Sequence, residues 1–298
     1  MLKFLTKYFL FFFSINLVVI IIFIVKFNIV ANSNTLIYDG RKIDFSSVDI
    51  AVFGHSQSQA GIDESIISKK LNLNAYNFSK TGIPLYYSVK HIEYFLKKND
   101  KIKIILSLGT NNIGKYGSLK ELLSKKNSRR VKYLAENIFF LNYDEIKFFA
   151  LDSPLDFYLS IYRAILKNPL RFTGSLNHNS SFDKISEREI QVKNLVQEEW
   201  EWEGVNYNLE KEKLKDLIGL RENISFKIVR LPEINSYVNW HNNKEEYDSY
   251  INELKGFNNV DFFDFVNSIS ESKYFRDYNH LSKKGKELFT LNFVEYLR

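Results

Sequence analysis

The chain has 298 residues, of which 45% are hydrophobic and 16% aromatic, so it can bury the core of one large α/β domain or of two smaller ones. Its 12 glycines and four prolines exclude a collagen-like or low-complexity chain, and the absence of cysteine excludes disulfides, thiolate metal sites and lipoprotein attachment. The net charge of +6 comes mostly from scattered lysines, a pattern typical of a solvated surface, so we predict no nucleic-acid partner.

The first predicted element is an apolar helix. Residues 8–25 carry no charge and consist mainly of Phe, Leu, Ile and Val, and this stretch is about long enough to cross a bilayer core as a helix. Lys3 and Lys7 precede the stretch and favour an N-terminus in the cytoplasm, which places the remainder of the chain outside. Lys26 and the basic pair at 41–42 lie on the other side and weaken this orientation.

A cleaved signal peptide is the alternative to a membrane anchor. The apolar stretch is long for a signal peptide, and residues 27–31 form a poor small-residue cleavage site. We therefore expect residues 1–30 to form one uncleaved transmembrane anchor, followed by a polar linker and a first strand over residues 31–47.

From residue 48 onward, strands and helices alternate. Asp63 precedes a predicted helix as its N-cap, and apolar residues recur at helical spacing from Leu85 to Leu96. Strands separated by helices of this length predict a parallel sheet with right-handed crossovers. The predicted strands are 48–53, 74–78, 102–108, 225–231 and 260–263, and further helices are predicted around 244–254 and over 283–297.

The pattern differs between about residues 113 and 220. Long segments rich in aromatic and charged residues predict helices over 129–140, 154–166 and 185–199. We interpret this part as a helical insertion within one α/β domain that spans residues 48–298.

Residues suited to acyl transfer stand at the ends of predicted elements. Ser56 lies on the turn after the strand 48–53, while Asp277 and His280 lie three residues apart just before the last helix. This is the chain order Ser…Asp…His found in serine hydrolases built on α/β sheets. In such a set Ser56 is the nucleophile and His280 accepts its proton. Asp277 orients the imidazole and stabilises the imidazolium.

Two further strand ends predict an oxyanion hole. Gly82 follows the second predicted strand and Asn111 follows the third, and ligands of an open α/β sheet bind where its strands end. The backbone N–H groups of Ser56 and Gly82, with the side-chain amide of Asn111, are therefore predicted to bind the tetrahedral oxyanion. Five scattered histidines and no cysteine predict no catalytic metal.

Together these motifs resemble the four sequence blocks of the SGNH (GDSL-type) hydrolases. The resemblance covers about residues 48–112 and 225–298, and it implies a flavodoxin-like three-layer fold and no cofactor. The sequence departs from the family at His55, where Asp is usual, and at Asn112, where Asp is common. The matching blocks are Gly54-His55-Ser56-Gln57-Ser58, Gly82, Gly109-Thr110-Asn111-Asn112 and Asp277-Tyr278-Asn279-His280.

Variants with a substituted first block are most similar to membrane-anchored proteins of bacterial envelopes, such as the teichoic-acid D-alanylation and alginate O-acetylation proteins. This resemblance implies a location at the bacterial cytoplasmic membrane, single-pass, with the N-terminus inside and the catalytic domain on the periplasmic or extracellular face. It also implies an acylated envelope polysaccharide as substrate. A membrane-bound O-acyltransferase is the implied partner, because acetyl-CoA is absent outside the cytoplasm.

Each motif also has a purely structural interpretation. A serine in such a turn is often only a turn residue, Asn111 also fits a loop closure, and Asp277 also fits a turn cap beside an exposed His280. Their joint occurrence, in order and at predicted element ends, favours the catalytic interpretation.

Three more residues are weaker candidates for substrate contact. His55 lies beside the predicted nucleophile, and Trp200 and Trp202 are suited to stack on sugar rings. The tryptophans equally fit the packing of a helical cap onto the sheet.

The sequence therefore predicts a membrane-anchored SGNH-like serine esterase or O-acyltransferase that modifies an envelope polysaccharide. The alternative is a catalytically degenerate, membrane-tethered protein that binds glycan or assists a membrane O-acyltransferase. The substitutions at His55 and Asn112 motivate that alternative, and covalent labelling of Ser56 distinguishes the two.

Overall fold

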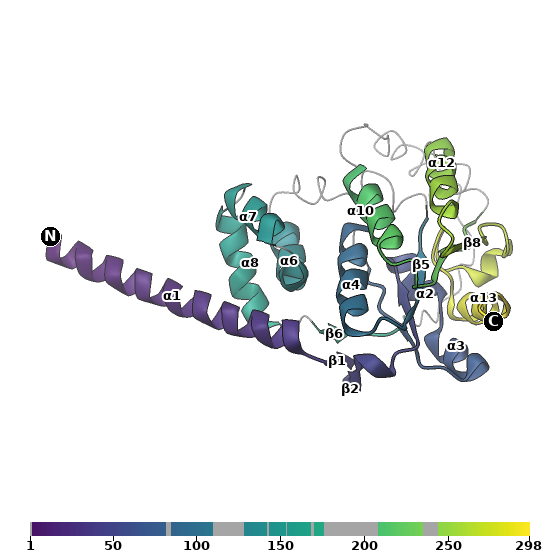
Figure 1. Ribbon diagram of the computed structural model, residues 1–298, viewed down its shortest axis with the longest axis horizontal. Coiled ribbons are helices and arrows are strands. Elements are labelled where there is room, and N and C mark those ends of the chain that lie inside the picture. The colour runs from purple at the N-terminus through teal and green to yellow at the C-terminus, as the bar shows by residue number, and fades with distance from the viewer. Residues whose placement is uncertain are drawn as a thin grey trace.

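The computed structural model is an α/β protein with a long N-terminal helix that projects from the body (Figure 1). The body contains a five-stranded parallel sheet with helices on both of its faces and a second, smaller sheet. The structure describes residues 2–81, 85–109, 128–141, 143–152, 154–167, 170–175, 208–234 and 244–298.

The principal sheet is parallel throughout. Its spatial order is β4-β3-β5-β7-β8, so the first of these strands along the chain lies between the second and the third. This is the flavodoxin-like order, in which ligands generally bind beyond the carboxyl ends of the strands where the order reverses, here β3 and β5. The predicted parallel three-layer α/β fold is confirmed. The strands are β3 (Ile50–Phe53), β4 (Ala75–Asn77), β5 (Lys103–Ser107), β7 (Phe226–Arg230) and β8 (Val260–Asp264).

Helices cover both faces of this sheet because successive residues of a strand point to opposite sides. Ala51 and Phe53 belong to one buried core, while Ile50 and Val52 belong to the other. A strand buried on both faces reads as a continuous apolar run, which explains the sequence of β3. The first core includes α4 (Leu85–Lys98), α10 (Asn208–Gly219) and α12 (Lys244–Lys255), and the second includes α3 (Glu64–Leu71) and α13 (Lys283–Phe293).

The five strands of the principal sheet begin and end within two residues of their predicted bounds. The helix predicted over 283–297 is divided into α13 and a 3-10 turn at Val294–Tyr296. The helix predicted over 185–199 lies outside the described residues. The α10 helix was not predicted, because charged residues surround its buried Leu214, Leu217 and Ile218.

A hairpin stands where the sequence predicted a linker and a single strand. Strands β1 (Thr35–Tyr38) and β2 (Arg41–Asp44) pair antiparallel, and the two-residue β6 (Arg171–Phe172) joins β1 on its other side. Asp39 and Gly40 both have positive φ, 47° and 79°, the conformation of a tight hairpin turn. The Asp-Gly pair was the local signal for this turn.

The N-terminal helix α1 (Leu2–Asn32) projects from the body, and most of its described side chains are exposed (Figure 1). Its segment Phe13–Asn32 is 20 residues long, has a mean hydropathy of 2.5 and is 6% buried. By length and composition it is a candidate membrane span, and an N-terminal signal sequence meets the same criteria. Its last turns contact α8 (Pro154–Leu166) and the 3-10 turn Ile138–Phe140. That turn follows α6 (Ser128–Asn137), and α7 (Tyr143–Asp152) lies between α6 and α8 in the chain.

Candidate active site

The turn after β3 is closed by a glycine. Gly54 has φ +149°, a backbone conformation that residues with side chains rarely adopt. A Cβ atom on Gly54 would lie 2.9 Å from the Cβ of Ser58 and 3.0 Å from the Cβ of Ser107. Because both distances are too short for ordinary contacts, only glycine fits between the end of β5 and the helix α2 (Ser56–Gly61).

His55 is the N-cap of α2. Its Nδ1 accepts a hydrogen bond from the backbone amide of Gln57 at 3.1 Å, and its side chain is buried. A ring nitrogen that accepts carries no proton, so His55 caps the helix as a neutral imidazole. The residue that replaces the family's Asp therefore caps the helix, and its predicted contact with substrate stays a prediction.

Two glutamines and a serine connect α2 to the rest of the fold. Gln57 Nε2 donates to Glu233 Oε1 at 2.9 Å, a bond that joins residues far apart in the chain. Ser58 Oγ accepts a hydrogen bond from the hydroxyl of Ser79, which follows β4, at 2.8 Å. Gln59 Oε1 accepts from both the amide and the hydroxyl of Thr81, at 3.1 and 2.9 Å. These side chains are buried, so the turn is held by tertiary hydrogen bonds.

Ser56 differs from its neighbours in the helix. All six residues of α2 are described, and Ser56 is the one that is not buried. It is the first residue of the helix, directly after the carboxyl end of β3. The position at which the sequence predicts a nucleophile is thus the accessible position of an otherwise buried turn.

The second motif is a short closed loop before α13. An antiparallel bridge between Phe275 and Leu281 closes the loop, and the amide of Arg276 donates to the carbonyl of His280 at 2.8 Å. Inside the loop, Asp277 Oδ1 lies 2.7 Å from His280 Nδ1 and also accepts from the His280 amide at 3.0 Å. The acid and the imidazole that the sequence paired are in contact.

The charge on Asp277 determines which ring nitrogen of His280 carries the proton. Partial burial alone would raise the pKa of Asp277, but hydrogen bonds and charge from His280, with backbone amides of the loop, lower that pKa below its ordinary value. An ionised carboxylate only accepts hydrogen bonds, so Nδ1 of His280 carries the proton that it donates. In the neutral ring Nε2 is then an acceptor, which is the tautomer that a general base requires.

One intermediate segment brings the loop and the turn to the same side of the sheet. Glu233 accepts a hydrogen bond from Gln57, as described above. The backbone amide of Ile234, the next residue, donates to the carbonyl of Tyr278 at 3.0 Å. The far end of α2 is also close to the loop, because a Cβ on Gly61 would lie 3.8 Å from Leu281. The residues that flank Ser56 and His280 are therefore connected through the segment after β7.

A buried charge pair supports this segment and was not predicted. Arg230 and Glu233 are both buried, with Nη2 and Oε2 3.7 Å apart, and Arg230 Nη1 lies 3.8 Å from Asp264. The Arg230 guanidinium also stands 5.1 Å from the ring centre of Tyr247. Arginine at the end of an apolar strand, followed within three residues by glutamate, was the signal available in the sequence.

Several predicted site residues lie outside the described residues. They are the oxyanion-hole candidates Gly82 and Asn111 and the substrate-contact candidates Trp200 and Trp202. His91, by contrast, is described and buried on α4, with ring centres 4.5 and 5.8 Å from Phe140 and Phe172. Burial lowers the pKa of His91, as expected for a packed, neutral ring.

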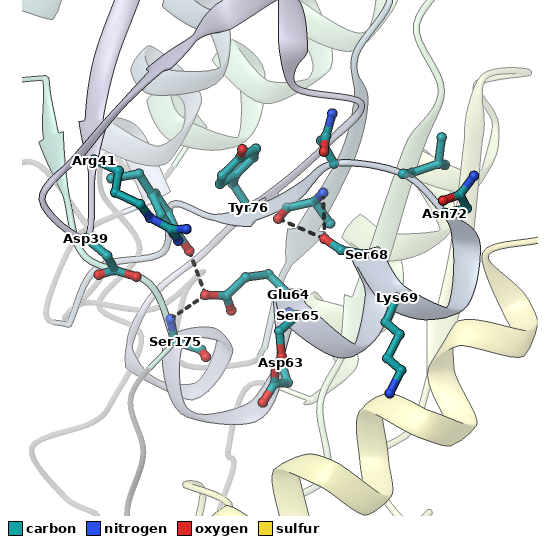
Figure 2. Close-up of a pocket in the computed structure, with 14 residues that line it drawn as sticks. Asp39, Arg41, Asp63, Glu64, Ser65, Ser68, Lys69, Asn72, Tyr76 and Ser175 are labelled. Carbon is teal, nitrogen blue, oxygen red and sulfur yellow. Dashed lines mark hydrogen bonds between the residues drawn. The ribbon is translucent and has the colours of Figure 1, made fainter.

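A cavity of about 730 Å³ lies apart from these residues, beside α3, β4 and the small sheet (Figure 2). Glu64 on its wall accepts hydrogen bonds from the hydroxyl of Tyr38 at 2.7 Å and from the amide of Ser175 at 3.1 Å. These bonds join α3 to the small sheet. None of the predicted catalytic residues lines the cavity, so we assign it no part in the reaction.

Comparison with known proteins adds little to this geometry. No family model matches the sequence, and no curated protein matches it. Solved structures that are similar include one described as a platelet activating factor from Streptococcus pneumonia, with TM-score 0.40, 14% identity and 85% of each chain covered.

Two further similar structures are esterases. One is the acetyl xylan esterase Est2A from the rumen bacterium Butyrivibrio proteoclasticus, with TM-score 0.35, 15% identity, and 87% of this chain and 66% of that chain covered. The other is a carbohydrate esterase with divergent catalytic and non-catalytic binding functions, with TM-score 0.37, 11% identity, and 86% and 67% covered. At these scores the likeness carries no argument, and the assignment rests on the residues of this chain.

Proposed function

We propose that the protein is a membrane-anchored, extracytoplasmic SGNH-like serine esterase or O-acyltransferase that acts on a cell-envelope polysaccharide. The observation that carries the proposal is the Asp277–His280 pair, 2.7 Å apart, in a loop connected through Glu233 to the turn that presents Ser56. A serine at an accessible helix start and an imidazole oriented by a carboxylate are the two groups that this kind of acyl transfer requires.

In the proposed acylation, the Oγ of Ser56 attacks the carbonyl carbon of an ester and its proton passes to Nε2 of His280. Asp277 stabilises the imidazolium that forms, and backbone or amide N–H groups bind the oxyanion. When the tetrahedral intermediate collapses, the bond to the leaving alcohol breaks and His280 returns the proton to that alcohol. Ser56 then carries the acyl group as an ester.

In the proposed deacylation, His280 takes a proton from water or from a sugar hydroxyl, and the oxygen of that molecule attacks the carbonyl carbon of the acyl-serine. The bond from that carbon to the Oγ of Ser56 then breaks, and His280 returns the proton to Oγ. Water gives hydrolysis and the sugar hydroxyl gives transfer, so the exclusion of water from the site decides the outcome. Transfer outside the cytoplasm requires an acyl group handed across the membrane. A membrane-bound O-acyltransferase is the proposed supplier.

The first test is Ser56→Ala, which removes the attacking oxygen. We expect loss of turnover of an activated acyl ester by about three or more orders of magnitude, with the thermal midpoint of unfolding nearly unchanged. Ser65→Ala is the matched control, because Ser65 is likewise a serine in the first turn of a helix and is not buried. Retained turnover in Ser56→Ala would refute the assignment.

The second test separates catalysis from a degenerate binding protein. A fluorophosphonate should label the full-length protein once, at Ser56, as mapped by peptide mass spectrometry. The Asp277→Asn variant should label much more slowly, because its imidazole loses the carboxylate that orients it. Absence of labelling, together with saturable glycan binding, would favour the degenerate alternative.

A further inference from the structure

The helix α8 has an apolar stripe on its surface. Leu155, Leu159, Tyr162 and Leu166 are between 44% and 73% exposed, and Tyr158 is exposed beside them. Their spacing of three or four residues places them on one face of the helix. Tyr143 and Leu151 of α7, the helix that precedes α8, are exposed as well, and we call these seven residues the α7–α8 face.

The opposite side of α8 packs against the protein. Ser160 and Ala164 are buried, and Ser160 Oγ donates to the carbonyl of Val131 in α6 at 3.3 Å. Phe157 and Ile161 pack against the first core, which lies on the α4 side of the principal sheet. The helix is therefore apolar on its exposed side as well as on its buried side, and monomeric soluble proteins rarely leave a large apolar surface open to water.

The last turn of α8 contacts α1. Lys26 Nζ donates to the carbonyls of Ala164 and Ile165, at 3.0 and 2.6 Å, in the last turn of α8. Three residues earlier in α1, the ring of Phe23 stacks on Phe139 with centres 5.4 Å apart. Lys26 is also the first charged residue after the apolar stretch of α1. The helix α8 therefore meets α1 where that stretch ends.

The position of this attachment agrees with the thickness of a membrane. The uncharged stretch 8–25 has 18 residues, which at ~1.5 Å per residue span roughly 27 Å, close to the ~30 Å of a bilayer core. Figure 1 shows α8 crossing the direction of α1, on the side of α6 that faces the N-terminal half of α1. If α1 spans the bilayer, α8 lies in the plane of its outer surface.

We infer that the α7–α8 face is a second membrane contact, inserted from outside into the interface between headgroups and acyl chains. The inference rests on the proposed anchoring by α1. Tyrosines such as Tyr158 and Tyr162 are typical of this interface, where the ring is apolar and the hydroxyl remains hydrated. Arg163 is exposed on the next position of α8 and is able to reach lipid phosphates. The two contacts together would hold the catalytic domain in one orientation on the membrane.

The absence of cysteine from the chain allows a direct test. Single variants Leu159→Cys, Leu291→Cys and Leu17→Cys of the full-length protein are labelled with a nitroxide and reconstituted in vesicles of phosphatidylcholine and phosphatidylglycerol. Leu291 of α13 is the matched control, because it is 39% exposed against 44% for Leu159 and lies at the opposite end of the molecule (Figure 1). Depth is measured from the relative access of oxygen and of a water-soluble relaxation agent.

We expect the label at 159 to lie ~5–10 Å below the headgroup boundary, the label at 17 deep in the hydrocarbon, and the label at 291 in water. A label at 159 in water while the label at 17 is deep would overturn the inference and leave the anchor intact. Both labels in water would overturn the anchor itself. Protection at 159 in native membranes but not in pure lipid would assign the face to a protein partner instead, against the inference.

Tyr162→Cys provides a second probe if Leu159→Cys unfolds, since both residues lie on the same face of α8. Ester turnover and the thermal midpoint of each labelled variant should match those of the unlabelled protein. A failure of catalysis with correct depth at 159 would count against the proposed function alone.

Discussion

The turn that carries Ser56 and the loop that carries His280 are stabilised in different ways. The turn is buried, and its side chains bond to residues distant in the chain, as Gln57 does to Glu233. The loop is partly exposed, and the bonds within it join residues two to four positions apart. The Asp277–His280 contact is therefore made by residues close together in the chain, whereas the turn is held by partners distant in the chain. Substitutions in the two regions should therefore affect different properties.

The largest expected effect is a loss of activity caused by a substitution in the loop that carries His280. Asp277→Asn should lower kcat by about 10⁴-fold, because the amide no longer imposes the tautomer in which Nε2 accepts a proton. Stability should change little at neutral pH, since the side chain is partly exposed. Asp261→Asn, an exposed aspartate bonded to Lys227, is the matched control. A loss of fold in Asp277→Asn would contradict the view that the loop serves mainly the chemistry.

The same variant has a pH signature with a definite sign. The pKa of Asp277 is lowered in the folded protein, so its stabilising contribution is present above its unfolded value of about 3.9 and is lost as pH falls through the folded value. The thermal midpoint of unfolding of the wild type should thus fall on acidification in this range. The midpoint of Asp277→Asn should fall less. Equal acid sensitivity of the two proteins would contradict the assigned contacts.

The next effect is on stability, in the support of the turn. Glu233→Ala leaves Arg230 buried without its nearest carboxylate, which should cost about 3–5 kcal/mol in the free energy of unfolding. Glu233→Gln should cost less, because the amide oxygen is still able to accept from Gln57. Denaturant unfolding measures both. Equal stability of the alanine variant and the wild type would show that the charge pair does not hold this segment.

The smallest expected effect compares two glycines. Gly54→Ala combines an unfavourable φ with contacts of 2.9 and 3.0 Å and should destabilise by about 1–3 kcal/mol. Gly40→Ala has positive φ but nothing within 4 Å of its Cβ, so its cost should be lower. A larger cost at Gly40 than at Gly54 would show that backbone strain, not the close approach of β5, requires glycine in the turn.

Much of this protein follows from local sequence. The apolar runs and their spacing predicted all five strands of the principal sheet. The clearest case is β3, which is buried on both faces and apolar throughout. The contact between Asp277 and His280 was also predictable, since they stand three positions apart and a short loop closes around both. Such features depend on neighbours in the chain.

Tertiary structure decided the rest. Nothing near β1 in the sequence indicates that it pairs with β6, and nothing near Gln57 indicates Glu233, because each partner is more than a hundred residues away. The exposure of one apolar face of α8 and the burial of the other also depend on where α1 and α6 pack. The free energy of a long-range contact is gained only when the whole chain has folded, so a local pattern does not encode it.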